Sequence, residues 1–338
     1  MSAHLCRGIA LSVVVACGVG CSGEIDDPAD DDDGGGGAVT LAFTTPTAGT
    51  SFARDTVEPS LGARAATIDV ELAVTGAPAS IELSAGDVAL GAIDVAGRGQ
   101  ALLVDPGATT LIATARDAAG AAVATASVDV MVVEPQVADC HGWLDLYGAA
   151  YEISAARPGV ADPITLTGAI NGLPYRYLGN AAVRPTFFMD CSLARSLLEA
   201  APYLRARGVV EVTDIGVYNY RCIGTGTPPN CPSGMSQHAY AKAIDIAGFT
   251  DVGGTFYSVN DDWVIDPAAE RTCDAGTTGD KDTFLHEAIC ELKDHAVWNI
   301  VLTPNYNADH RNHFHVDLTA GSNFIRRRFA VDDGPDGH

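Results

Sequence analysis

The sequence predicts two folded domains, an all-β sandwich followed by an α+β domain. The first prediction depends on hydrophobic residues that alternate with polar ones between about residues 39 and 134, which is the pattern of half-buried strands. The second depends on a change of composition after Pro135, where helical and strand patterns mix and where every Trp and eight of the nine His lie. A chain of 338 residues with 47% hydrophobic residues is long enough for two such cores.

The overall charge excludes some classes of partner. The chain has 43 Asp and Glu against 20 Lys and Arg, a formal net charge of −23. Nucleic-acid binding needs a surplus of Lys and Arg to neutralise phosphates, so we expect no nucleic-acid partner. The same argument excludes docking on anionic lipid headgroups.

Residues 1–20 have the pattern of an export signal, with Arg7 before an apolar run and small residues before a cysteine. The cysteines after this run resemble the processing box of bacterial lipoproteins, in which the acylated cysteine becomes the first mature residue. Cys17 fits better by the residues before it and Cys21 by the length of the apolar stretch, and we favour Cys21. A simple secretory signal is the alternative. We expect a protein anchored by lipid in the bacterial cell envelope, periplasmic or surface-exposed.

The next two segments differ in their capacity to fold. Residues 21–37 are rich in Asp and end in four glycines, so they predict a flexible tether. Residues 38–135 contain about six or seven short strands separated by turn signals, and they resemble the immunoglobulin-like modules of bacterial surface proteins. This module contains no Cys or His, so we assign it a spacer or weak binding role.

Residues 138–330 form the predicted α+β domain, and residues 331–338 a disordered tail. Hydrophobic spacing predicts helices at 191–207, interrupted or bent at Pro202, and at 283–297. Short strands are expected at 209–217, 243–249 and 314–318. Six cysteines lie in this domain, and export favours up to three disulfides among them, with 15 connectivities that the sequence leaves open. They are Cys140, Cys191, Cys222, Cys231, Cys273 and Cys290.

The strongest chemical signal is a cluster of His and Asp residues. Residues 236–245 read SQHAYAKAID, and residues 310–315 read HRNHFH. Imidazoles and a carboxylate suit a divalent metal, and a catalytic zinc takes three protein ligands and a water. His238, Asp245 and His315 are the candidate ligands. Residues two apart on a strand face the same side, so His313 and His315 should both face the metal while Phe314 enters the core.

The pattern S-x-H-x-x-x-x-A-x-D followed by H-x-H resembles the zinc peptidase group of D-alanyl-D-alanine carboxypeptidases, lysostaphin-like enzymes and the hedgehog signalling domain. More closely, residues from about 140 to 318 resemble the extensin-like C-terminal domain. The matching stretches are Cys191 to Ala194, Ser236 to Phe249, Asp262-Trp263, and residues 304–318, PNYNADHRNHFHVDL. The resemblance implies an α+β zinc peptidase-like domain, an antiparallel sheet with flanking helices, that binds one Zn²⁺ through the three candidate ligands.

The resemblance also implies roles for neighbouring residues. His313 would be the catalytic histidine, Ser236 would orient the ligand loop, and Arg221 would hold a substrate carboxylate or the oxyanion. Two positions depart from the pattern. Ala241 replaces a glycine three residues after the first ligand, and Asn312 replaces the Glu that several relatives use as general base. Another carboxylate, such as that of Asp214, would then have to serve if His313 does not.

The resemblance implies a zinc metallopeptidase that hydrolyses peptidoglycan stem or cross-link peptides, as a carboxypeptidase or an endopeptidase. The alternative is a non-catalytic module that keeps zinc and binds cell wall or protein, as the hedgehog domain illustrates. A serine hydrolase is disfavoured because no G-x-S-x-G motif surrounds any serine. Residues 286–290, HEAIC, fall one residue short of the H-E-x-x-H zinc helix, and we interpret them as a helix with a disulfide cysteine.

Overall fold

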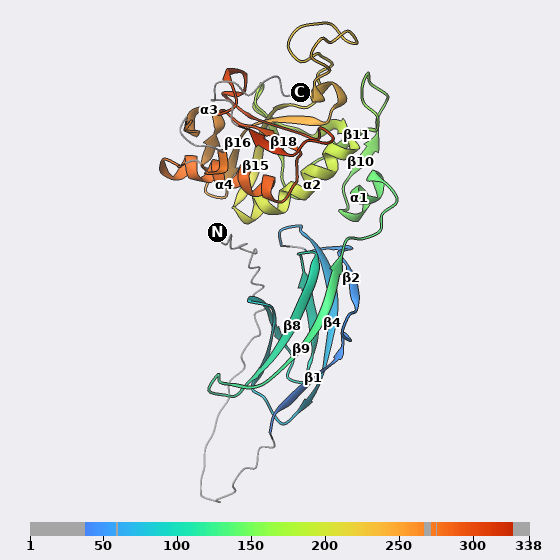
Figure 1. The fold of residues 1–338 in the computed structure, drawn as a ribbon, viewed down its shortest axis with the longest axis vertical. Coiled ribbons are helices and arrows are strands. Elements are labelled where there is room, and N and C mark those ends of the chain that lie inside the picture. The colour runs from blue at the N-terminus through green and yellow to red at the C-terminus, as the bar shows by residue number, and fades with distance from the viewer. Residues whose placement is uncertain (1–37, 59, 267–271, 275, 327–338) are drawn as a thin grey trace, which may run out of the picture. The chain divides into compact units, whose positions relative to one another are not determined.

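The computed structural model describes residues 38–58, 60–266, 272–274 and 276–326, which form two compact units (Figure 1). The predicted export signal, both candidate lipidation cysteines, the predicted tether and the predicted tail lie outside these residues. Among the described helices, none is long and apolar enough to cross a membrane.

The described residues of the first unit, 38–58 and 64–136, form two β-sheets that enclose one core. One sheet has the order β1 (Thr40–Thr45), β4 (Arg64–Thr75), β3 (Thr56–Val57), with β7 (Arg98–Leu103) also paired to β4. The other has the order β2 (Ser51–Ala53), β9 (Ala122–Val133), β8 (Gly107–Arg116), β5 (Ser80–Ala85), β6 (Val88–Ile93). The expected sandwich is present, and its relation to immunoglobulin-like modules stays a prediction.

The alternating pattern explains the core of this unit. Ile68, Val70 and Leu72 on β4 are buried, whereas Asp69 and Glu71 between them are exposed. The unit has more strands than the six or seven predicted, because β2 and β3 are only three and two residues long and show no alternation. Backbone pairing with β9 and β4 defines these two strands instead.

The second unit mixes helices with two sheets. A three-stranded antiparallel sheet contains β10 (Tyr151–Ile153), β11 (Pro163–Thr167) and β14 (Thr186–Asp190). An eight-stranded sheet has the order β13 (Ala182–Val183), β12 (Tyr175–Tyr177), β15 (Val209–Gly216), β16 (Ala243–Asp251), β19 (Phe314–Asp317), β18 (Ile300–Leu302), β20 (Phe324–Arg326), with β17 (Phe256–Ser258) paired to β16. The helices are α1 (Cys140–Leu146), α2 (Cys191–Ala206), α3 (Val259–Asp262) and α4 (Gly279–Asp294).

The sheet differs from the predicted antiparallel arrangement at two pairs. Strand β12 pairs parallel with β15, and β18 pairs parallel with β20. The first parallel pair follows from the connection, because the chain returns from β12 to β15 through α2 and a helical crossover brings the next strand back in the same direction. The three strands expected from the sequence are confirmed as β15, β16 and β19, within two residues at each end.

Helices α2 and α4 contact each other and pack against the eight-stranded sheet (Figure 1). Helix α2 begins after Asp190, whose carboxylate accepts a hydrogen bond from the Ser192 backbone N–H. The prediction was a bend or an interruption at Pro202, and the interruption is absent. The helix continues because this stretch is buried in the core, where packing offsets one lost hydrogen bond. Helix α4 begins at Gly279, four residues before the predicted start, and ends at Asp294.

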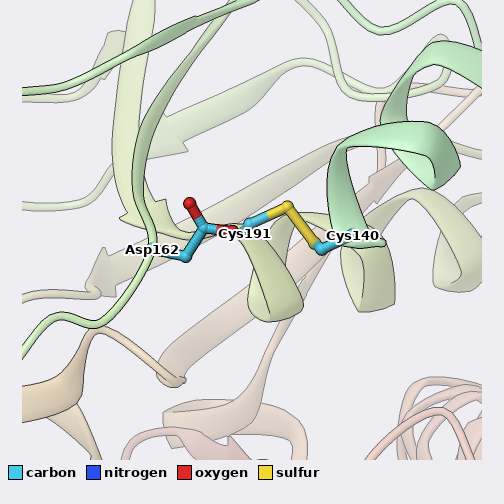
Figure 2. Close-up of side chains that lie close together, drawn as sticks. All are labelled: Cys140, Asp162 and Cys191. Carbon is cyan, nitrogen blue, oxygen red and sulfur yellow. A yellow bond between two sulfur atoms is a disulfide. The ribbon is translucent and has the colours of Figure 1, made fainter. Parts of the chain in front are cut away.

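Three disulfides join the six cysteines of this unit: Cys140 with Cys191, Cys222 with Cys231, and Cys273 with Cys290. Cys290 lies in α4, as interpreted from the HEAIC motif. Figure 2 shows the first disulfide beside Asp162. This group resembles a metal cluster in composition, but both sulfurs are bonded to each other and thiolates, which bind metals, are absent. The cluster is structural.

Candidate metal centre

The candidate ligands lie on one face of the central strand pair. Asp245 on β16 and His315 on β19 are directly opposite each other in the antiparallel register. The preceding residue on each strand, Ile244 or Phe314, is buried in the core that also contains residues of α2 and α4. Since successive side chains on a strand point to opposite faces, Asp245 and His315 lie on the sheet face away from these helices.

His238 comes from a single turn of 3₁₀ helix, Gln237–Tyr240, just before β16. The hydroxyl of Ser236 caps this turn by accepting a hydrogen bond from the His238 backbone N–H at 3.3 Å. The turn ends at Ala241, which has a left-handed backbone with φ of 53°. A left-handed alanine costs about 1–2 kcal/mol, a strain that glycine would avoid. In this chain the turn forms with alanine, and its methyl group is buried in the core.

The three candidate ligating atoms lie within hydrogen-bond distance of one another. His238 Nε2 lies 3.1 Å from Asp245 Oδ1 and 3.1 Å from His315 Nδ1. His315 Nδ1 lies 2.9 Å from Asp245 Oδ1. Ligands on a tetrahedral zinc with bonds near 2.0 Å are about 3.3 Å apart, so small outward movements bring these atoms to zinc-binding positions.

The opposite ring nitrogens fix the proton positions. His238 Nδ1 donates to the Val217 carbonyl oxygen at 2.7 Å, and His315 Nε2 donates to Asp317 Oδ2 at 3.1 Å. In this tautomer each inner nitrogen can offer a lone pair to a metal ion beside Asp245. Three such atoms at this separation need a positive charge between them, which is a metal ion or, without one, a proton on His315 Nδ1 shared with Asp245. Metal-bound histidines characteristically donate their other N–H in this way. The donor set fits a divalent metal ion.

The pKa values of this cluster reflect the same geometry. Burial would raise the pKa of Asp245, but hydrogen bonds with His238 and His315 dominate and lower it well below its usual range. Burial would lower the pKa of His315, but hydrogen bonds with Asp245 and Asp317 outweigh burial and raise it to about 9. The metal-free cluster thus keeps Asp245 charged and stabilises one positive charge beside it.

His313 lies at the edge of the centre, as its spacing from His315 predicts. Its Nε2 is 3.5 Å from Asp245 Oδ1, and its Nδ1 donates to Asn312 Oδ1 at 2.8 Å. Burial lowers the pKa of His313 below its ordinary value, so the ring is neutral near pH 7. Asn312 therefore contacts the histidine and leaves the Nε2 lone pair directed toward the centre.

The expected alternative base, Asp214, is not available. Its side chain is fully buried on β15 and forms two hydrogen bonds with Arg184, at 2.6 and 2.8 Å. This pairing occupies both carboxylate oxygens. Asp214 is therefore a structural partner of Arg184, and the suggestion that it serves as base is wrong.

A cavity of about 460 Å³ lies beside His238 and Asp245. Arg221 lines it, as do Arg157 and Arg184, and their positive charges face a lining that is otherwise largely aromatic and apolar. Arg221 also lies close enough to His310 and His313 to contribute to the lowering of both pKa values. The predicted position of Arg221 beside the site is therefore present in the structure.

Sequence reasoning missed other residues at the site. Asp317 lies two residues after His315 on β19, on the same face of the strand, and accepts a hydrogen bond from it. The spacing H-x-D within a strand is the sequence signal that indicates such a partner. His310 packs 5.2 Å from His313 and 5.7 Å from His315 between ring centroids, and burial lowers its pKa to about 3. Arg157 and Arg184 lie far from the motifs in sequence, so only the fold brings them to the cavity.

Gly159 allows a loop to approach the turn that contains His238. Its φ is 82°, and an added Cβ would lie 2.4 Å from the Ala239 carbonyl oxygen. We expect Gly159→Ala to lower the free energy of unfolding by about 2 kcal/mol, from backbone strain and this clash. Gly148→Ala is the control, since Gly148 has φ of 63° and open space around it. Urea titration should show the larger loss for Gly159→Ala, and equal losses would contradict the prediction.

Comparison with known proteins places this domain in a family. Residues 153–326, just over half of the chain, match the family described as Extensin-like protein C-terminus. No curated protein matches this chain. Among solved structures, it is similar to the fibronectin(III)-like modules of CbhA from Clostridium thermocellum, with 17% identity and a TM-score of 0.24 over 29% of this chain and 99% of that one. It is also similar to an endo-beta-1,4-mannanase from Thermotoga petrophila, with 14% identity and a TM-score of 0.22 over 29% of this chain and 20% of that one.

The two structural likenesses are too weak to bear on fold or function. The family match is different, because it includes every candidate metal ligand together with His313, Arg221 and the cavity beside them. The chain therefore belongs to the extensin-like protein C-terminus family.

Proposed function

We propose that this protein is a zinc-dependent peptidase of the bacterial cell envelope that hydrolyses peptidoglycan peptides. The single observation that supports this most directly is the convergence of three lone pairs from His238, Asp245 and His315, beside a cavity large enough for a short peptide. The proposed localisation depends on the export pattern of residues 1–20 and on the candidate lipidation cysteine that follows.

The metal would be held by His238 Nε2, His315 Nδ1 and Asp245 Oδ1. When bound, Zn²⁺ supplies a Lewis acid and lowers the pKa of water to about 7. Val217 and Asp317 accept hydrogen bonds from the opposite ring nitrogens and so keep both imidazoles oriented toward the ion. One side of the donor set faces the cavity, where a substrate carbonyl would approach.

His313 is the proposed proton carrier. Its hydrogen bond to Asn312 keeps the proton on Nδ1, so the neutral ring presents the Nε2 lone pair to the reaction site. This nitrogen would accept a proton from the attacking water and return it to the leaving amine. Arg221 would stabilise negative charge that develops on the substrate oxygen, because its guanidinium lines the same cavity.

A second function is supported by Asn312. The family resemblance implies a carboxylate base at this position. Asp245, a candidate metal ligand, is the one carboxylate among the described residues that line the cavity. If His313 alone is insufficient, the domain would hold zinc and bind cell-wall peptides or a protein without turnover. Zinc content does not separate the two functions, whereas hydrolysis does.

The test measures zinc content and peptide release with the full chain folded under oxidising conditions. We expect one zinc per chain and release of soluble peptides or D-alanine from purified peptidoglycan. Stoichiometric zinc without release from any of several cell-wall preparations would favour the binding module. Absence of zinc would contradict both functions.

Asp317 should affect zinc affinity through His315. We expect Asp317→Ala to weaken zinc binding by about 10–100-fold, because the imidazole loses the partner that fixes its tautomer and orientation. Competition with a chromogenic chelator gives the dissociation constant. Asp251→Ala, on the neighbouring β16, removes another structural carboxylate and should leave zinc affinity unchanged. If Asp317→Ala binds zinc as tightly as the parent, Asp317 does not support metal binding through His315.

A further inference from the structure

The three arginines of the cavity differ in their surroundings. Arg184 is neutralised by the buried carboxylate of Asp214. In the part of the chain that the structure describes, neither Arg157 nor Arg221 forms an ion pair. Two guanidinium groups are thus available to a ligand, in a protein whose formal net charge is −23.

Aromatic rings hold the guanidinium of Arg157 in place. It lies 3.9 Å from the ring centroid of Phe188 and 5.5 Å from that of Tyr218. The two rings pack edge to face with centroids 5.5 Å apart, and both line the cavity. Stacking on a ring orients a guanidinium while its N–H donors, which lie in its own plane, stay free for a planar anion.

The loop that contains Arg157 is fixed to the site. The Tyr218 hydroxyl donates to the Pro158 carbonyl oxygen at 3.1 Å, and Gly159 approaches the Ala239 carbonyl oxygen of the metal-binding turn. Both contacts hold the loop in position beside the cavity without a ligand. Little entropy is then lost when Arg157 binds a partner.

The lining limits what that partner is. Asp245, a candidate metal ligand, is the one carboxylate among the residues described as lining the cavity. With its charge engaged by the histidines and a cation, the remaining charged groups there are arginines. Cavities for small molecules measure about 300–1,000 Å³, and a volume near 460 Å³ suits a few peptide residues. A fixed guanidinium recognises a carboxylate by paired hydrogen bonds.

We propose that Arg157 determines specificity by binding a side-chain carboxylate of the peptide held at the metal centre, so that the site selects acidic peptides. This inference depends on the proposed function for the peptide nature of the occupant. Arg221 is left for the group that reacts beside the metal, and Arg157 contributes to selection from a separate loop.

The experiment uses the zinc-loaded full chain and pairs of synthetic peptides that end in D-alanyl-D-alanine. Within each pair, the residue one or two positions before this unit is D-glutamate or D-glutamine. Affinity is measured by titration calorimetry, or as kcat/KM where cleavage occurs, and D-alanine release is recorded in parallel. The variant is Arg157→Met, which keeps the packing on Phe188. The control is Arg195→Met, which removes the same charge from a guanidinium stacked 4.1 Å from the Trp143 ring outside the cavity.

We expect the parent and the Arg195→Met protein to prefer a glutamate peptide by about tenfold or more, and Arg157→Met to lose this preference while zinc content and Tm stay unchanged. Equal affinities for both peptides in the parent, no binding of either, or an undiminished preference in Arg157→Met would each overturn the proposal. Preference without D-alanine release would contradict the peptidase function and leave the role of Arg157 intact.

Discussion

His315→Ala should lose both zinc and peptide release. The substitution removes one of the three proposed ligands and leaves His238 and Asp245, which would hold the ion from one strand and its preceding turn only. We expect zinc affinity to fall by more than about 100-fold, beyond the effect of an outer partner such as Asp317. Activity should fall to background at zinc concentrations that saturate the parent.

His313→Ala separates metal binding from proton transfer. Because His313 lies at the edge of the centre, we expect the variant to keep one zinc and to lose peptide release by about 10²–10⁴-fold, the usual contribution of a general acid or base. His295→Ala is the matched control, since His295 stacks on Tyr203 away from the centre. If His313→Ala keeps its activity, His313 does not transfer the proton. If the variant fails to bind zinc, His313 is a metal ligand instead.

Arg184→Met should destabilise the fold strongly. The substitution leaves the fully buried carboxylate of Asp214 without its partner, and breaking a buried pair from one side costs about 3–5 kcal/mol. Arg176→Met is a matched control on the adjacent β12, because its pair with Glu211 is more exposed and such pairs contribute about 1 kcal/mol or less. Urea unfolding should show the difference. Equal losses in the two variants would contradict the argument.

The stability lost in Arg184→Met should depend on pH. Burial raises the pKa of Asp214, against the lowering effect of Arg184, so removal of Arg184 raises this pKa further. Between the unfolded pKa, near 4, and the higher folded pKa, the folded state holds a proton that the unfolded state has released, and stability falls as pH rises. The deficit relative to the parent should therefore be smaller at about pH 5 than at about pH 8. A deficit that grows on acidification would contradict this assignment.

Local patterns were sufficient to predict the strands that carry two of the candidate metal ligands, Asp245 and His315. The alternation in residues 243–249 and 314–318 identified β16 and β19, because a strand with one face in a core leaves a period of two in the sequence. The same spacing placed His313 and His315 on one side and Phe314 in the core. The ligand set itself is a sequence motif, and its atoms do converge in the fold.

Properties that depend on which distant segments meet were beyond the sequence. The six cysteines allowed 15 connectivities, and only the positions of their backbones select one. Parallel pairing of β12 with β15 depends on the crossover through α2. The ion pair between Arg184 and Asp214 likewise joins residues 30 positions apart in the sequence, and no local sequence pattern predicts it.

Short-range spacing was enough to predict the sandwich and α+β classes, the candidate metal-binding motif and the family resemblance, because alternation, helical periodicity and motif spacing are local properties of the chain. Packing was needed to show that Asp214 is paired with Arg184 and that Arg157 lies in the cavity beside the candidate metal centre. The physical reason is that burial, pairing and pKa are properties of a side chain's surroundings, and packing brings those surroundings from several segments at once.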